Sequence, residues 1–157
     1  MQGAGGKNMK NETSKNLIRC GWCGDDPLYV AYHDEEWGYP VHDDHKLFEF
    51  LLLEGAQAGL SWITVLRKRE RYRSAFDDFD PVRIATYGER KVNQLLRNEG
   101  IIRNRLKIES AISNARQFLE IVDREGSFDQ YVWQFVDRVP KQNDVRDSAE
   151  IAARSER

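Results

Sequence analysis

The feature of this sequence that most constrains its fold is a series of apolar residues at helical spacing between Ile108 and Val122. They recur every three or four positions, which places them on one face of a single long helix. The series consists of Ile108, Ala111, Ile112, Ala115, Phe118, Leu119 and Val122. No segment shows a convincing strand-like alternation, and there is no internal repeat or low-complexity linker. The sequence therefore predicts an all-α fold with this stripe in the core.

Capping signals predict further helices elsewhere in the chain. Two Asp-Pro pairs, at residues 26–27 and 80–81, each place a capping carboxylate before a proline that suits the first helical turn. Ser127 and Gln130 form a capping-box pattern ahead of another apolar segment. We expect a helix to begin after each of these signals.

The length and charge of the chain limit what it can be. Its 157 residues suit one domain with a real core, and its net charge of -2 gives no general attraction for nucleic acid, so any such contact needs a local basic patch. No apolar run is long enough to span a membrane, and the first residues lack the apolar core of a signal peptide. We expect a cytoplasmic protein with a disordered leader at 1–18 and a single helical domain at 19–157.

Glu54 gives the clearest indication of function. It lies three residues after Leu51 and seven after Leu47, so on a helix we expect it to share their buried face, where loss of hydration is costly. Trp62 follows it, and four more aromatic residues lie upstream: Trp22, Tyr29, Tyr32 and Trp37. A desolvated carboxylate among aromatic rings suits a flat, cationic, nitrogen-rich ligand. Spacing alone favours the alternative, in which Glu54 pairs with a buried arginine or caps a neighbouring helix.

A helical hairpin is predicted around residues 92–107. Apolar residues at 92–96 form a short helix that Gly100 would end in a left-handed cap, and Arg103, Arg105 and Lys107 begin the next helix. This is the layout of a helix-hairpin-helix, whose backbone N–H groups hold a DNA phosphate. The alternative is an ordinary hairpin with a glycine cap and solvated charges.

A second basic segment, RKRERYR, spans residues 67–73. Charge runs of this kind usually form the solvated face of a helix, and we prefer this interpretation. The functional alternative is a second contact with a nucleic-acid backbone, directly downstream of Trp62.

Long motifs follow one another in order from Arg19: CGW, DPLYVAYHDEEWG, LFE, LEGAQAGLSW, VLRKRERYR and FDP, and then NEGIIRNRLKIESAISNA and YVWQFV. Over about residues 19–140 the chain strongly resembles the 3-methyladenine DNA glycosylase I family in its bacterial, zinc-containing form. The resemblance implies a helix-hairpin-helix glycosylase-like helical domain.

The resemblance also implies a reaction, the hydrolysis of the N-glycosidic bond of 3-methyladenine in duplex DNA during base excision repair. The base must leave the stack to be reached. Because alkylation makes it cationic and a good leaving group, selective binding matters more than a strong general acid. The implied partners are double-stranded DNA with alkylated adenine and free 3-methyladenine as product.

The family resemblance assigns roles to individual residues. Glu54 would accept hydrogen bonds from the base, Tyr32 would add a polar contact and Trp62 would stack on the ring. Further residues would line the same pocket, namely Trp22, Tyr29 and Trp37. Others would contact DNA, namely Gln57, Gly59 and Leu60 in the loop that fills the gap left by the base, and Gly100, Arg103 and Lys107 at the phosphate. No lysine lies within residues 47–62, so we expect no Schiff base and a monofunctional enzyme.

The resemblance implies a structural zinc held in part by Cys20 and His33. The family's other two ligands come from a C-terminal H-x3-C motif, whereas no His or Cys follows His45 here. A structural zinc takes four ligands, so we expect half a site, weak zinc binding and a missing C-terminal segment. This leaves two alternatives to the enzyme: a catalytically silent module that binds damaged DNA or alkylated bases, and a metal-dependent regulator that uses Cys20, Cys23 and His33.

Overall fold

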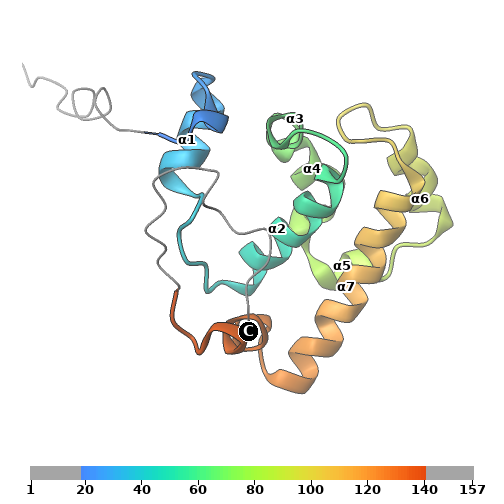
Figure 1. Cartoon of the computed structure of the whole chain (residues 1–157). Helices are drawn as coiled ribbons and strands as arrows, with labels where there is room; N and C mark the ends of the chain where they lie inside the picture. Colours follow the sequence, from blue (N-terminus) through green and yellow to red (C-terminus); the bar gives the residue numbers. More distant parts are fainter. Residues whose placement is uncertain (1–18, 141–157) are drawn as a thin grey trace, which may run out of the picture. The chain divides into compact units, whose positions relative to one another are not determined.

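The computed structural model describes residues 19–140, and all regular elements in that range are α-helices or 3-10 turns (Figure 1). The predicted all-α fold is confirmed. Packing divides the chain into two compact units, Met1–Tyr39 and Pro40–Arg157, which we describe separately. The leader predicted at 1–18 lies outside the described residues, and the single domain at 19–157 stays a prediction. Between residues 19 and 140, no helix is long and apolar enough to cross a membrane.

In the described part of the first unit, residues 19–39, the 3-10 turn η2 (Gly21–Cys23) packs on the helix α1 (Pro27–Glu35). Asp26 caps α1 as predicted, because its side chain accepts hydrogen bonds from the backbone N–H groups of Leu28 and Tyr29 at 3.0 and 3.3 Å. Pro27 occupies the first helical position, where no backbone donor is needed. The predicted helix start at residue 27 is therefore confirmed.

The second unit is built around two longer helices, α2 (Asp44–Gln57) and α7 (Arg105–Glu125), which pack against each other. Its other elements within residues 40–140 are α3 (Trp62–Leu66), α4 (Arg69–Ala75), η3 (Asp77–Phe79), α5 (Pro81–Ala85), α6 (Glu89–Leu96), α8 (Phe128–Trp133) and η4 (Gln134–Val136). Helix α7 also contacts α5, α6 and α8, so it is the element on which most of this unit is assembled (Figure 1).

The apolar stripe of α7 forms the centre of the core, as predicted. Its buried residues are Ile108, Ala111, Ile112, Ala115 and Phe118. The ring of Phe118 meets that of Phe48 from α2 at 4.9 Å between centroids. Asn104 caps the start of α7 by accepting a hydrogen bond from Lys107 N, and Gly126 ends the helix with a φ of 89°. Truncating side chains this well buried typically costs about 2–5 kcal/mol.

The other predicted caps are also present in the second unit. Asp80 accepts hydrogen bonds from two amides in the first turn of α5, and Ser127 Oγ accepts one from Gln130 N at 3.0 Å. Asp44, in the first turn of α2, accepts hydrogen bonds from the first two amides of α8 at 2.9 and 2.7 Å. Local signals thus set where α5 and α8 begin, and Asp44 adds a long-range cap that fixes α8 to α2.

Candidate nucleic-acid interface

Helix α2 buries a different face from the one predicted. Its buried residues are Phe48, Glu49, Leu52, Leu53 and Ala56. Glu54 is exposed in the last turn of the helix, and Leu47 and Leu51 are only half-buried. The prediction that Glu54 lies on the buried face is therefore wrong. Apolar residues surround most of α2, so periodicity alone did not identify the face that meets α7.

Glu54 is nevertheless in an unusual position for a surface carboxylate. Partial burial of its carboxyl group raises its pKa above the ordinary value, although the residue as a whole is exposed. Within residues 19–140 no cation or hydrogen-bond donor reaches this carboxylate. The predicted alternative, pairing with a buried arginine, is therefore not seen in the described part of the chain. Glu54 presents an acceptor that a ligand can use.

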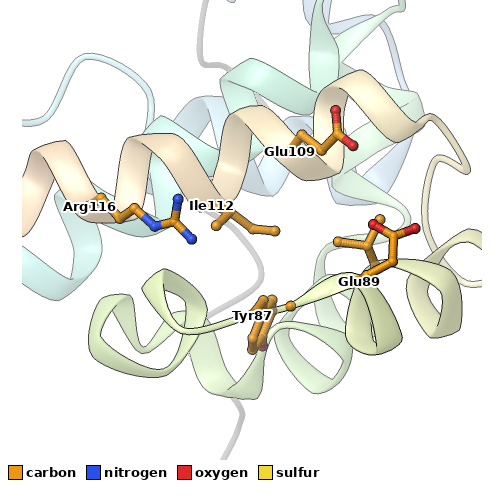
Figure 2. Close-up of a pocket in the computed structure, with 7 residues that line it drawn as sticks. Tyr87, Glu89, Glu109, Ile112 and Arg116 are labelled. Atoms are coloured by element: carbon orange, nitrogen blue, oxygen red, sulfur yellow. The ribbon is translucent and has the colours of Figure 1, made fainter.

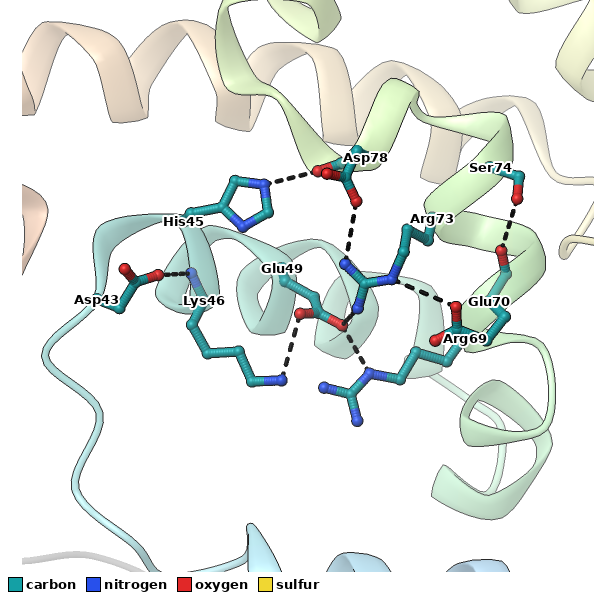
Figure 3. Close-up of polar contacts among 9 residues, drawn as sticks. All are labelled: Asp43, His45, Lys46, Glu49, Arg69, Glu70, Arg73, Ser74 and Asp78. Carbon is teal, nitrogen blue, oxygen red and sulfur yellow. Dashed lines mark hydrogen bonds and ion pairs between the residues drawn. The ribbon is translucent and has the colours of Figure 1, made fainter.

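The buried carboxylate of α2 is Glu49, whose side chain is 2% exposed. Its Oε1 accepts hydrogen bonds from Arg69 at 2.6 Å and Arg73 at 2.9 Å, and its Oε2 lies 3.4 Å from Lys46 Nζ (Figure 3). Burial by itself would raise the pKa of Glu49. The hydrogen bond from Arg69 and the three neighbouring positive charges outweigh this, so the pKa is lowered overall. Glu49 is therefore a structural ion-pair partner that ties α2 to α4.

This network corrects the interpretation of residues 67–73 as a solvated helix face. Arg69 and Arg73 lie four residues apart on one side of α4, and the side chain of Arg69 is only 11% exposed. The sequence analysis missed Glu49 as their partner. The usable signal was a carboxylate inside the apolar run of α2 together with two arginines at matched helical spacing, since buried charges are normally paired.

The predicted hairpin between α6 and α7 is present, but Gly100 does not form the predicted left-handed cap. Helix α6 ends before Arg97, and Gly100 is not among the residues with positive φ. Gly100 N donates a hydrogen bond to Asn98 Oδ1 at 2.8 Å. A Cβ at this position would lie 2.9 Å from Asn98 Oδ1 and 3.1 Å from Arg71 Cβ. Glycine is needed here because the hairpin approaches α4 closely.

The three basic residues predicted to begin the second hairpin helix have different surroundings. Lys107 Nζ donates hydrogen bonds to the carbonyl oxygens of Ala56 and Ala58 at 2.6 and 2.7 Å, so it caps the C-terminus of α2. Arg105 is held by glutamates of α6 and α7 at 3.0 and 3.1 Å. Arg103 is half-exposed, and its one ion-pair partner in the described region, Glu99, lies 3.8 Å away. Of the three, Arg103 is the most available to a phosphate.

The turn after Glu54, residues 58–61, lies beside this hairpin. Gly59 has a φ of 76°, a left-handed conformation that favours glycine. The turn is closed by Gln57, whose Nε2 donates to Leu60 O at 2.8 Å, and the side chain of Leu60 is 37% exposed. Through Lys107 the turn is fastened to the start of α7, and Figure 1 shows the two loops at the same end of this unit.

Trp62 is the first residue of α3 and follows this turn directly. Its ring is half-buried and packs against the core of the second unit. Ser61 precedes it and shares a hydrogen bond of 2.7 Å with Thr64, both through their hydroxyl groups. The structure therefore brings four predicted features to one end of the second unit: Glu54, the turn at 58–61, Trp62 and the hairpin.

The aromatic residues predicted to line the pocket form one cluster in the first unit. Trp22 lies at its centre, with its ring centroid 5.0 Å from that of Tyr29 and 5.1 Å from that of Trp37. Tyr32 is buried and lies 6.5 Å from Tyr29 between centroids, whereas Trp22 and Trp37 are exposed. Burial raises the pKa of Tyr29. The packing of η2 on α1 thus brings together aromatic residues that are spread over positions 22–37 of the sequence.

Cys20 and His33, the predicted zinc ligands, lie next to each other in the first unit. Cys20 N donates to His33 Nε2 at 3.4 Å, and His33 Nδ1 lies 2.9 Å from Asp34. Hydrogen bonds from Arg19 and His33 lower the pKa of Asp34 to about 2. Cys23 is buried, with its Sγ 3.7 Å from a backbone carbonyl oxygen. Among residues 19–140, no group of three or more His, Cys, Asp or Glu side chains is arranged to hold a metal ion.

Comparison with known proteins places the chain in a family. Residues 22–157 match the methyladenine glycosylase family. The chain belongs to this family. DNA-3-methyladenine glycosylase 1 of Escherichia coli (strain K12) is 51% identical over 135 residues, which make up 86% of this chain and 72% of that protein. The family resemblance inferred from the sequence motifs is confirmed.

Solved structures of this family share the fold of the chain. A crystal structure of 3-methyladenine DNA glycosylase I superposes with a TM-score of 0.83 at 53% identity, covering 86% of this chain and 74% of the other. A variant of a 3-methyladenine DNA glycosylase I in complex with 3-methyladenine gives 0.85 at 33% identity, covering 89% and 75%. The helical glycosylase fold is therefore confirmed, while the roles predicted for individual residues stay predictions.

Proposed function

We propose that this chain carries out the reaction named for its relatives: it hydrolyses the N-glycosidic bond of 3-methyladenine in DNA, releases the base and leaves an abasic site. It is a monofunctional DNA glycosylase of base excision repair. Support comes from the 51% identity to the DNA-3-methyladenine glycosylase 1 of E. coli and from the likeness to a structure that holds 3-methyladenine.

The observation that carries this proposal is the double hydrogen bond from Lys107 to Ala56 O and Ala58 O. It joins the end of α2, where the carboxylate of Glu54 has no partner within residues 19–140, to the start of the second hairpin helix. A glycosylase needs these two functions close together, because it must hold the DNA backbone while the extruded base enters a pocket.

The groups at this end of the second unit account for recognition of a methylated adenine. The base carries a positive charge, so a carboxylate that accepts its hydrogen bonds, as we assign to Glu54, stabilises the cationic form. Trp62 supplies a π-face for stacking and cation–π attraction. Leu60, exposed on the turn, enters the space that the base leaves in the duplex. Because the alkylated base is already a good leaving group, binding and orientation account for most of the catalysis.

The test is base release from methylated duplex DNA, measured chromatographically as free 3-methyladenine. The wild-type chain should release the base, and Glu54→Gln should lose most of this activity. Asp123→Asn is the matched control, because it removes an exposed carboxylate from α7, far along the sequence from the proposed site. Binding of methylated DNA by the wild type without any base release would overturn the enzymatic proposal in favour of a damage-binding module.

We also propose that Cys20 and His33 supply two ligands of the family's structural zinc. The support is their adjacency and the contact of His33 Nδ1 with Asp34, since a metal-bound histidine usually has its other nitrogen oriented by a carboxylate. Zinc at this position would join η2 to α1. The fit is partial, because a closed tetrahedral site needs four ligands.

Zinc content by elemental analysis tests this second proposal, together with the shift in unfolding temperature on chelation. With two ligands the ion stays open to water, so we expect less than one zinc per chain and a further loss in Cys20→Ser. Stoichiometric zinc that Cys20→Ser leaves unchanged would overturn the assignment.

Several sequence-based assignments stay predictions. They are the base-pocket roles of Tyr32, Trp22, Tyr29 and Trp37, and the DNA contacts of Gln57, Gly59, Gly100 and Arg103. A phosphate contact was also predicted for Lys107, but its ammonium group caps α2 in the structure, so we do not expect it to contribute to DNA binding. The predicted cytoplasmic location also stays a prediction.

A further inference from the structure

The outer face of α6 carries positive charge that nothing in the described residues neutralises. An open surface hollow on this helix is lined by Arg90, Asn93, Gln94 and Arg97. Neither guanidinium group has an ion-pair or hydrogen-bond partner within residues 19–140, and both arginines are exposed. This surface, which we call the α6 arginine face, is therefore open to an anionic partner.

The spacing of these residues suits an extended anion. Positions 90, 93, 94 and 97 lie on one side of an α-helix. Arg97 lies seven positions after Arg90, which corresponds to about 10 Å along the helix axis. Successive phosphates of one DNA strand are separated by about 3.4 Å along the duplex axis, so the face spans roughly three nucleotides.

On the side of α6 that faces α7, by contrast, the charged groups are paired. Figure 2 shows a pocket there, lined in part by Tyr87, Glu89, Glu109, Ile112 and Arg116. Arg105 binds both of these glutamates, at 3.0 and 3.1 Å, and Arg116 Nε donates to Ala85 O at 3.0 Å. The charges between α6 and α7 are thus paired within the protein, whereas those of the α6 arginine face have no partner in the part of the chain that the structure describes.

The α6 arginine face is continuous with the hairpin. Arg97 follows the last residue of α6 and is the first residue of the loop at 97–104. Near the end of that loop, Arg103 has one ion-pair partner among the described residues, Glu99 at 3.8 Å. Because the whole chain has a net charge of -2, attraction to a polyanion must come from such local groups.

We propose that the α6 arginine face binds the phosphate backbone of one DNA strand next to the lesion, as an extension of the contact at the hairpin. The inference rests on the proposed function for its partner, duplex DNA. The contact does not read sequence, because it involves phosphates only, and it lowers the dissociation constant for damaged and undamaged duplexes alike.

The salt dependence of binding to an undamaged duplex tests this inference. Each phosphate contact contributes about 0.9 to the slope of log K against log salt, so Arg90→Gln/Arg97→Gln should reduce the slope by about 1.8. Each single variant should lose about half of this amount. Arg90→Lys/Arg97→Lys keeps the charges and should restore most of the slope. Arg124→Gln is the matched control, because it removes one exposed arginine that is paired with Glu125 near the other end of α7.

An unchanged slope in the double glutamine variant, with helicity intact by circular dichroism, would overturn the inference. A loss in Arg124→Gln equal to that of each single α6 variant would also overturn it, because the effect would then reflect overall charge. Base release by the wild type is scored separately. If the wild type releases no base and the double variant still flattens the salt dependence, the α6 contact stands and the proposed function fails.

Discussion

The arginines of α4 and those of α6 have the same chemistry but opposite surroundings. Arg69 and Arg73 reach the buried carboxylate of Glu49, and their charges hold α2 against α4. Arg90 and Arg97 face solvent and have no partner among the described residues. The difference shows that a charge run is structural or available for binding according to the partner that the fold supplies. Its composition does not decide this.

The two glutamates of α2, which are five positions apart, show the same contrast between a paired and an available charge. Glu49 is buried, binds three cations and has a lowered pKa. Glu54 is exposed, has no partner in the described part of the chain and has a raised pKa. We therefore expect changes at Glu49 to alter stability and changes at Glu54 to alter ligand binding.

The largest expected effect is that of Glu49→Ala on stability. It removes the buried carboxylate that accepts hydrogen bonds from Arg69 and Arg73, so the free energy of unfolding should fall by about 3–5 kcal/mol. Urea unfolding followed by circular dichroism measures this. Glu109→Ala is the matched control: Glu109 is an exposed partner of Arg105, and its loss should cost no more than about 1 kcal/mol. Equal losses in the two variants would show that the Glu49 network is no stronger than a surface pair.

Glu54→Gln should weaken binding of free 3-methyladenine by about 1.5–3 kcal/mol, the usual contribution of a hydrogen bond to a charged group. Stability should not fall, because the raised pKa of Glu54 shows that its charged form is already disfavoured in the folded state. Titration monitored by tryptophan fluorescence gives the affinity. An unchanged affinity with intact helicity would remove Glu54 from the base pocket.

A smaller effect, on the salt dependence of DNA binding, should distinguish the roles of Arg103 and Lys107 in the hairpin. Arg103→Ala should reduce the salt slope of DNA binding by about 0.9, because Arg103 is available to a phosphate. Lys107→Ala should leave the slope unchanged and instead lower the unfolding free energy by about 1.5 kcal/mol, because its ammonium group caps α2. Salt titrations and urea unfolding of both variants measure this. A reduced slope in Lys107→Ala would assign a phosphate contact to that residue.

The smallest effect concerns pH and the first unit. The pKa of Asp34 is lowered from 3.8 to about 2, so its contribution to stability is fully present above about pH 4 and is lost as the pH falls toward 2. Asp34→Asn should remove this dependence. Thermal unfolding between pH 5 and 2, followed by tryptophan fluorescence, is compared for the two proteins. The same acid destabilisation in wild type and variant would show that Asp34 does not contribute.

Local features of the sequence determined much of the secondary structure and the family. The apolar stripe of α7 and the caps at Asp26, Asp80 and Ser127 were predicted correctly. Each depends on residues within a few positions of one another, where helical geometry fixes which groups can meet. The order of long motifs identified the family, because motifs in series are specific even when each is short.

Tertiary packing alone decided which charges are structural. The buried face of α2 was not predictable, since apolar residues occupy most sides of that helix and the choice depends on α7 and α4. Glu49 meets partners 20 and 24 residues away, and Lys107 reaches carbonyl groups 51 and 49 residues away. Sequence spacing defines neighbours within a helix, whereas the partner of a charge across two helices is defined only when the chain packs.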